Sequence, residues 1–182
     1  MRHDFKDGNG PQPAHRHINP DGSFGGWVED TATVEGTAYI DATAEVCDGA
    51  QVLGSASVRD GATVAGNAVV RDNAQVYDGY VADNAVVRDN AVVREASVLD
   101  SAEVSDNAQV LDNSELHGTA KVRDNAVVIA CDFASGEAVG GDDVVRGERR
   151  GIEYDDEADF SMDAFLGSGE HMTDDDEDSL YT

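Results

Sequence analysis

Residues 64–76 read Val-Ala-Gly-Asn-Ala-Val-Val-Arg-Asp-Asn-Ala-Gln-Val, in which Val64, Val70 and Val76 mark a six-residue repeat. An aliphatic residue, here called a rung, recurs at this spacing through most of the chain, eighteen times in all. A small residue, usually alanine, stands two positions before nearly every rung. The rungs are Val28, Val34, Ile40, Val46, Val52, Val58, Val64, Val70, Val76, Val81, Val87, Val93, Val98, Val104, Val110, Leu116, Val122 and Val128.

The period of this repeat excludes a helix. A helical face needs apolar residues three and four positions apart, whereas an even spacing of six keeps strand residues on the same side. Each rung is therefore predicted to be a short strand whose valine and alanine point inward. Just ahead of the alanine stands a Gly or Asn, which enters the left-handed backbone region at low cost and predicts one bend per rung. These predicted bend residues are Gly49, Gly61, Asn67, Asn73, Asn84, Asn90, Asn107, Asn113 and Asn125.

One strand and one bend per six residues builds a solenoid. A single coil has no core of its own, so the coils must stack to bury the valines. Eighteen rungs at three per coil predict six triangular coils in one domain, about 29 Å tall at roughly 4.8 Å per coil. Two steps, Val76 to Val81 and Val93 to Val98, are five residues long. They end one coil apart, at the same corner, which supports three rungs per coil.

The Val-x-Asp-Asn-Ala-x repeats resemble those of the hexapeptide-repeat proteins over about residues 28–130. The resemblance implies an all-β fold, a left-handed parallel β-helix with triangular coils. Left-handedness comes from the resemblance alone, since parallel crossovers are usually right-handed. The family includes acyltransferases and zinc-dependent carbonic anhydrases, and trimers are common in it.

The regions on either side of the repeat differ from it in composition. Residues 1–27 are predicted to be an N-terminal extension and cap, with a turn at Asn19-Pro20-Asp21-Gly22 and with Phe24 and Trp27 as its bulky apolar residues. A cap is needed because unpaired strands at an open end recruit other chains. This segment resembles those that precede hexapeptide arrays in bacterial and phage proteins of non-enzymatic type.

Residues 131–182 are predicted to be an acidic tail or docking arm. From Asp132 onward there are 17 acids against three arginines, and Gly140-Gly141 is predicted to be a hinge. The segment Asp155 to Leu166 sets four apolar residues among acids and predicts a short amphipathic docking element, with disorder in isolation as the alternative. Its apolar residues are Phe160, Met162, Phe165 and Leu166.

The net charge of −26 comes from 38 acidic and 12 basic residues, of which only Lys6 and Lys121 are lysine. Such acid-rich, lysine-poor chains look like proteins of salt-loving organisms, where molar salt shortens the Debye length to about 3 Å. An acidic protein of another source is the alternative. The charge argues against nucleic-acid binding, which needs basic residues to displace counterions.

Other sequence features bear on the cellular setting. No stretch is apolar enough to span a bilayer and no signal-peptide run follows Met1, so we expect no membrane partner and no general secretory export. Cys47 and Cys131 are predicted to lie coils apart as two unpaired thiols.

Stacking places the turn acids in columns. One corner is predicted to hold Asp72, Asp89, Asp106 and Asp124, where Arg71, Arg88 and Arg123 supply neutralising charge. Ca²⁺ or K⁺ along these carboxylates is one prediction, since hard cations prefer oxygen ligands. Caps of the backbone turns by the aspartate side chains are favoured over it. No other cofactor is expected.

An enzymatic function of this chain would depend on its histidines. The family's transferases place a catalytic histidine on a long loop at a cleft between subunits, and no such loop interrupts residues 28–128. His117 is the catalytic candidate, but no orienting partner for it is evident in the sequence. His15 and His17 form a His-x-His pair, too few ligands for zinc, and are predicted to serve the cap or a subunit contact.

Paired valines predict an interface. Where two valines are adjacent the second points inward, which leaves Val69, Val86, Val92 and Val127 facing outward. Recurring exposed aliphatics on a flat wall favour a buried contact in a homotrimer.

These features favour a non-catalytic structural protein. The most specific hypothesis is a virion component of a haloarchaeal tailed virus, such as a capsid turret, decoration or tail-spike protein. A trimeric hexapeptide acyltransferase is the alternative, and a cytoplasmic polymer-forming or cation-binding scaffold is a further one.

Overall fold

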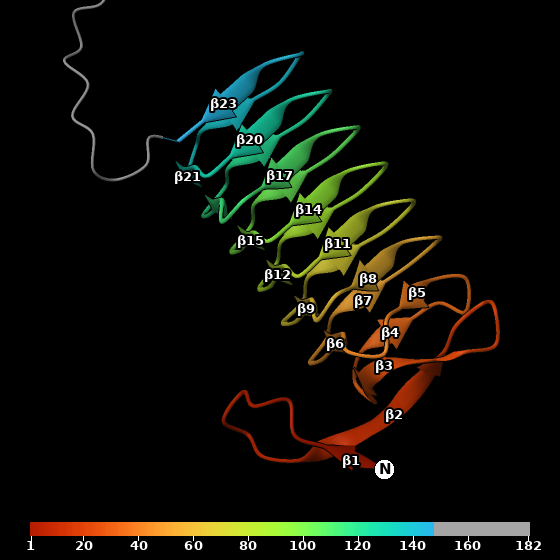
Figure 1. Ribbon diagram of the computed structural model, residues 1–182. Coiled ribbons are helices and arrows are strands. Elements are labelled where there is room, and N and C mark those ends of the chain that lie inside the picture. The colour runs from red at the N-terminus through yellow and green to blue at the C-terminus, as the bar shows by residue number, and fades with distance from the viewer. Residues whose placement is uncertain (148–182) are drawn as a thin grey trace, which may run out of the picture. The chain divides into compact units, whose positions relative to one another are not determined.

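The computed structural model describes residues 1–147. Within this range the chain forms a stack of short strands joined by tight turns, with a hairpin beneath the first coil (Figure 1). The described residues contain no helix long and apolar enough to cross a membrane.

The strands form three walls, each of parallel strands from successive coils. The first wall consists of β3 (Phe24–Glu29), β6 (Glu45–Val46), β9 (Thr63–Val64), β12 (Tyr80–Val81), β15 (Ser97–Val98), β18 (Glu115–Leu116) and β21 (Asp132–Phe133). The second wall consists of β4 (Thr33–Val34), β7 (Gln51–Val52), β10 (Val69–Val70), β13 (Val86–Val87), β16 (Glu103–Val104), β19 (Lys121–Val122) and β22 (Ala138–Val139). The third wall consists of β5 (Tyr39–Ile40), β8 (Ser57–Arg59), β11 (Gln75–Tyr77), β14 (Val92–Arg94), β17 (Gln109–Leu111), β20 (Val127–Ile129) and β23 (Val144–Arg146).

The predicted register is confirmed. Val64, Val81 and Val98 are successive partners on the first wall, and all three are fully buried. The two five-residue steps both lie at the corner between the third and first walls. Fully burying one valine contributes about 1.5–3 kcal/mol, so the column of rungs is the main source of stability.

The prediction of six coils was short by one, because each wall contributes seven strands to the stack. The seventh coil passes through Phe133 and Val139 and ends on β23. Phe133 replaces the aliphatic rung and Cys131 takes the place of the small residue before it, so the pattern is hidden there. The predicted boundary at residue 130 therefore falls inside the stack, and Gly140-Gly141 is a corner of the last coil rather than a hinge.

The left-handed backbone conformation lies one residue earlier than predicted. Gly61 and Asn113 do have positive φ, but at most corners the residue with positive φ is the acid or glycine two positions after a rung. Asp72 has a φ of 63° and Asp89 a φ of 61°, for example. Aspartate tolerates this region better than most residues do. The asparagines that follow extend the turn without carrying its special conformation.

The N-terminal cap is an antiparallel hairpin. β2 (Gln12–Ile18) pairs with β3, and β1 (Arg2–His3) pairs with β2. The predicted turn closes through a hydrogen bond from the Gly22 amide to the Asn19 carbonyl (2.8 Å).

Asn19 closes the lower edge of the third wall. Its side-chain oxygen accepts a bond from the Ile40 amide (2.9 Å), and its side-chain nitrogen donates to the Ile40 carbonyl (3.1 Å). The amide thus imitates a paired strand residue, which satisfies groups that would be costly to bury unpaired. Gly26 lies against the first coil so closely that a Cβ there would stand 2.0 Å from the Ala44 carbonyl oxygen.

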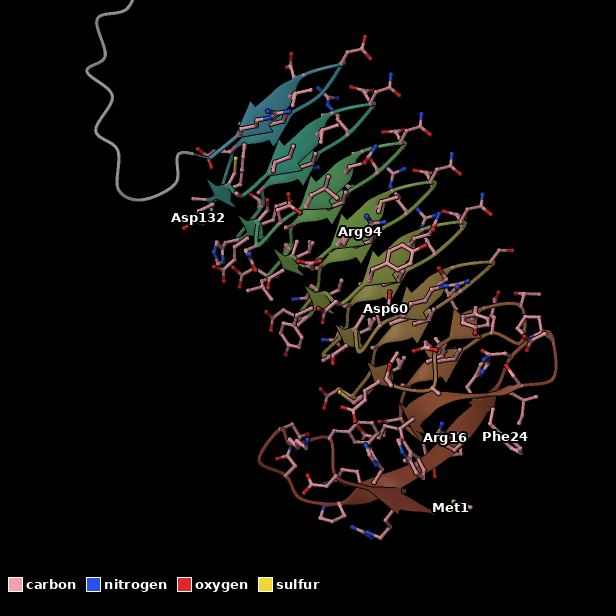
Figure 2. The ribbon with its side chains drawn as sticks, in the orientation of Figure 1. Met1, Arg16, Phe24, Asp60, Arg94 and Asp132 are labelled. Carbon is pink, nitrogen blue, oxygen red and sulfur yellow. The ribbon has the colours of Figure 1, made fainter. Side chains whose placement is uncertain are left out.

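Phe24 and Trp27 both lie on the cap hairpin, but they differ in their surroundings. Phe24 is 71% exposed and points away from the coils (Figure 2). Trp27 lies between the His3 ring, stacked at 4.6 Å, and the Arg16 guanidinium at 5.4 Å. The open end is therefore closed by polar groups and glycine main chain, because the first coil presents backbone hydrogen-bonding groups rather than an apolar surface.

Both cysteines are free, as predicted, and both are buried. Cys47 belongs to a stripe of small apolar residues on the outside of the first wall, with Ala65 and Ala82, and Phe5 packs in the same cluster. Burial raises the pKa of the Cys47 thiol to about 12, which leaves it unreactive as a nucleophile at neutral pH.

Acidification should weaken the cap through His17. This side chain is buried and its Nε2 bonds the Ala38 carbonyl (3.1 Å), and burial lowers its pKa below the ordinary 6.5. A lowered histidine pKa contributes stability above 6.5 that is lost as the pH falls from there toward the folded-state value. We expect the free energy of unfolding, measured by urea titration in molar KCl, to fall more between pH 7.5 and 5 for the wild type than for His17→Gln. Parallel curves for the two proteins would contradict this role.

Candidate functional site

The turn acids bind the coil above them. At the corners on either side of the second wall, their carboxylates accept hydrogen bonds from backbone amides at the same turn position one coil later. Asp100 accepts from Gly118 (2.8 Å), Asp124 accepts from Gly141 (2.9 Å), and Asp106 accepts from Asp124 (3.2 Å). The predicted capping role is therefore present, but the bond runs between coils and not within one turn.

Asparagine side chains add a second ladder at the corner between the second and third walls. Each side-chain nitrogen donates to the side-chain oxygen one coil later, and the distances fall between 2.8 and 3.3 Å. The ladder runs through Asn73, Asn90, Asn107, Asn125 and Asp142.

The arginines beside the acid column neutralise it, as predicted. Arg71 lies 2.7 Å from Asp72, and Arg88 contacts both Asp89 and Glu103, the latter at 2.9 Å. The Arg88 side chain holds the pKa of Glu103 below its usual value, with a further contribution from Lys121. A bond from the Ser105 hydroxyl is the main cause that lowers the pKa of Asp106.

The four predicted metal candidates, Asp72, Asp89, Asp106 and Asp124, all accept backbone amides. Each of them except Asp106 also contacts an arginine, and Asp106 accepts from the Ser105 hydroxyl instead. Within residues 1–147 no group of three or more His, Cys, Asp or Glu side chains has an arrangement suited to a metal ion. Ca²⁺ or K⁺ along the column stays a prediction.

The histidines of the cap lie in separate contacts. The Nδ1 of His15 lies 2.9 Å from Asp30 at the surface, whereas His17 is buried under the first coil. His3 bonds Glu45 (2.7 Å) while it stacks on Trp27. His15 and His17 therefore serve the cap, as expected.

His117 has the carboxylate neighbours that the sequence did not reveal. Its Nε2 lies 3.3 Å from Asp132 and 3.7 Å from Glu115, which are its neighbours across the outside of the first wall. No partner was evident in the sequence, because Asp132 belongs to the seventh coil and comes near His117 only in the fold. The Asp132 side chain is 74% exposed, so this pair lies in solvent rather than in an enclosed site.

A recess of about 530 Å³ lies where the third wall turns into the first, and Glu115, two residues before His117, is part of its lining. It forms where Gly79 and Ala96 shorten two successive corners, between the longer corners at Gly61 and Asn113. Its lining includes Asp78, Glu95, Glu115 and the half-exposed Tyr80, and contains no basic residue. Such a surface accepts hydrogen bonds from hydroxyl or ammonium groups and repels anions, including the phosphates of an acyl carrier such as coenzyme A.

The predicted interface valines divide between two walls. Val69 and Val86 are neighbours on the outside of the second wall. Val92 and Val127 lie on the third wall, with Gln109 between them. All four are partly exposed, so their outward direction is confirmed, but they do not form one continuous patch.

The third wall is the one of the three whose strands contain no acidic residue. Its outer face shows two columns, one on each side of the buried rungs. The first column runs Tyr39, Ser57, Gln75, Val92, Gln109, Val127, Val144. The second runs Arg59, Tyr77, Arg94, Leu111, Ile129, Arg146.

Among residues 1–147, Arg59 and Arg94 of this wall have no acidic partner, unlike the arginines beside the second wall. Arg59 lies over the Tyr39 ring at 4.3 Å and Arg94 over the Tyr77 ring at 5.2 Å. Neither makes an ion pair with any residue in the described range, although Asp60 and Glu95 follow them directly in sequence. The buried Nε of Arg59 has no hydrogen-bond partner there. Figure 2 shows Arg94 on the outer surface of the stack.

The sequence predicted Val92 and Val127 of the first column, but the second column was missed because its residues occupy the position after a rung, where no period is visible along the chain. The column could have been found by taking the residue after every third rung. This selection gives Arg59, Tyr77, Arg94, Leu111, Ile129 and Arg146.

No protein-family model, curated protein or solved structure matches the chain. The parallel solenoid itself is consistent with the hexapeptide-repeat resemblance. What the chain does must therefore be argued from its own surfaces.

Substitutions at Asp100 should separate the two roles of a turn acid, which are to accept the hydrogen bond from the next coil and to adopt a positive φ. Asp100→Asn keeps an acceptor and tolerates positive φ, so we expect a change in unfolding free energy within about 0.5 kcal/mol. Asp100→Gly loses the acceptor alone and should cost about 1 kcal/mol, and Asp100→Ala should cost about 2 kcal/mol because it adds backbone strain. Urea titration in molar KCl measures all three, and equal losses for Asn and Gly would show that the inter-coil bond contributes nothing.

Replacement of His117 tests the transferase alternative. Because the recess lined by Glu115 is anionic and Asp132 is exposed, we expect no acetyl-CoA turnover by the wild type in molar KCl and no change in unfolding free energy beyond about 0.5 kcal/mol in His117→Ala. Turnover that the wild type shows and His117→Ala lacks would establish catalysis at this residue. His15→Ala serves as the matched control for a general effect of removing a surface imidazole.

Proposed function

We propose that the chain is a non-catalytic structural protein that works by assembly, with the outer face of the third wall as its interface. The observation that carries this proposal is the composition of that face. In a chain of net charge −26, its strands contain no acid, expose arginines and aliphatic side chains, and leave Arg59 and Arg94 without ion pairs among the described residues.

The charge pattern favours a partner rather than solvent. Columns of acids at Asp60, Asp78, Glu95 and Asp112 border the wall on one side, and Asp72 and its column border it on the other. A face without acids between two acidic edges has the form of an interface, in which an apolar centre is surrounded by a charged rim.

The arrangement of the stack supports a structural role. Val, Ala and the ladders of inter-coil bonds join every coil to the next, so the wall is a preformed surface that needs little ordering on binding. In its most specific form the proposal is a virion component of a haloarchaeal tailed virus, a capsid turret, decoration or tail-spike protein. The acid-rich, lysine-poor composition supports the halophilic setting.

Two other functions stay as alternatives. An acyltransferase would use His117, whose contact with Asp132 is the observation in its favour. A homotrimer held by the outward valines and a cation-binding or polymer-forming scaffold in the cytoplasm also stay as predictions.

A substitution on the third wall should release the protein from its assembly. In the source cells, the tagged wild type should sediment in a high-mass fraction, and quantitative mass spectrometry of purified virus particles tests the virion form of the proposal. Ile129→Asp should move the protein to the free fraction, because it places a charge in the apolar centre of the wall. Lys121→Glu, on the second wall, is the matched control and should behave as the wild type.

Equal sedimentation of Ile129→Asp and wild type would contradict the proposed interface. Circular dichroism must first show that both variants keep the β spectrum of the wild type.

A further inference from the structure

We infer that the third wall binds the segment Asp155–Leu166 of a second copy of the chain. This inference rests on the proposed function and gives that interface a partner. It joins the acid-free face of the solenoid to the segment in which Phe160, Met162, Phe165 and Leu166 stand among acids. That segment lies outside the described residues, so its part in the argument comes from its sequence alone.

The upper half of the wall presents a short binding strip. Arg94, Leu111, Ile129 and Arg146 are successive partners across β14, β17, β20 and β23. Three strand spacings of about 4.8 Å separate the two arginines by about 14 Å. Beside them runs the first column, in which Val92, Val127 and the 57% exposed Val144 are apolar.

The segment contains charges at the matching separation. Asp159 and Asp163 enclose Phe160 and Met162, and four residues of extended chain span about 13 Å. We place the segment in an extended form that runs parallel to the axis of the stack and contacts the wall with its backbone edge. Successive side chains of an extended segment point to opposite sides of it. Asp159 and Asp163 then face the arginine column while Phe160 and Met162 face the valine column.

The dimensions of the wall favour a narrow partner. The two columns lie two residues apart, about 7 Å, and the seven strands extend over about 29 Å. In a contact between two whole walls the acid columns on the edges would repel each other, whereas a single acidic segment reaches the arginines between them.

Charge exchange between the two partners is the test. Full-length chains in about 0.5 M KCl are compared by analytical ultracentrifugation as wild type, Arg94→Glu, Asp159→Arg and the double variant. Each single variant should weaken self-association at least tenfold, since it places like charges together. The double variant restores opposite charges and should regain affinity to within about threefold of the wild type. Arg123→Glu, on the second wall, is the matched control and should leave affinity unchanged.

Isotope mixing identifies which copy supplies the segment. Unlabelled chain with p-benzoylphenylalanine at position 160 is mixed with ¹⁵N-labelled chain and irradiated. We expect cross-links to labelled peptides from β14, β17, β20 or β23. Cross-links confined to unlabelled peptides would place the segment on its own chain and overturn the inference.

The outcomes separate this inference from the proposed function. If Arg94→Glu weakens association while Asp159→Arg does not and the double variant shows no recovery, the wall is an interface but the segment is not its partner. If neither variant changes association and Ile129→Asp also assembles normally, both proposals fail. Phe24→Ser, which removes an exposed phenylalanine elsewhere, controls for loss of apolar surface.

Discussion

The structure depends on hydrogen bonds that run from one coil to the next. At most corners on either side of the second wall, a carboxylate of one coil accepts the amide of a positive-φ residue in the next coil, as Asp100 does from Gly118. At the corner between the third and first walls a backbone carbonyl of the preceding coil accepts this amide instead, as the Tyr77 carbonyl does from Glu95. The strands add the same dependence, because each wall pairs only strands of different coils. A coil is therefore stable only as a member of the stack, and the valine core exists because this pairing aligns the rungs.

This constraint explains how much the sequence predicts. The even period, the short steps and the inward valines follow from side-chain alternation, and each was found. The last coil was missed because Phe133 and Cys131 fill the rung and alanine positions with other residue types, while the stack tolerates both at its end. The position of positive φ was missed by one residue, since aspartate is chosen at Asp72 and Asp89 for its acceptor as well as for its backbone.

The surfaces were less predictable than the core. Arg94, Leu111 and Ile129 are 17 or 18 residues apart in sequence and become neighbours only through the pairing of strands. The partner of His117 was hidden for the same reason, because Asp132 belongs to the next coil on the same wall. Phe24 shows the opposite case, in which an apolar residue near an open end faces solvent because backbone groups needed Asn19 and His17 there instead.

The asparagine ladder has a direction along the stack. Every amide donates toward the C-terminal end, so the local dipoles add, and a coil joined at that end must offer an acceptor while one joined at the other must offer a donor. The final member, Asp142, accepts from Asn125 at 2.8 Å, and an ionised carboxylate has no hydrogen to pass on. The replacement of an amide by a carboxylate at this position thus ends the ladder. A further coil added above it would find no side-chain donor at this corner with which to continue the ladder.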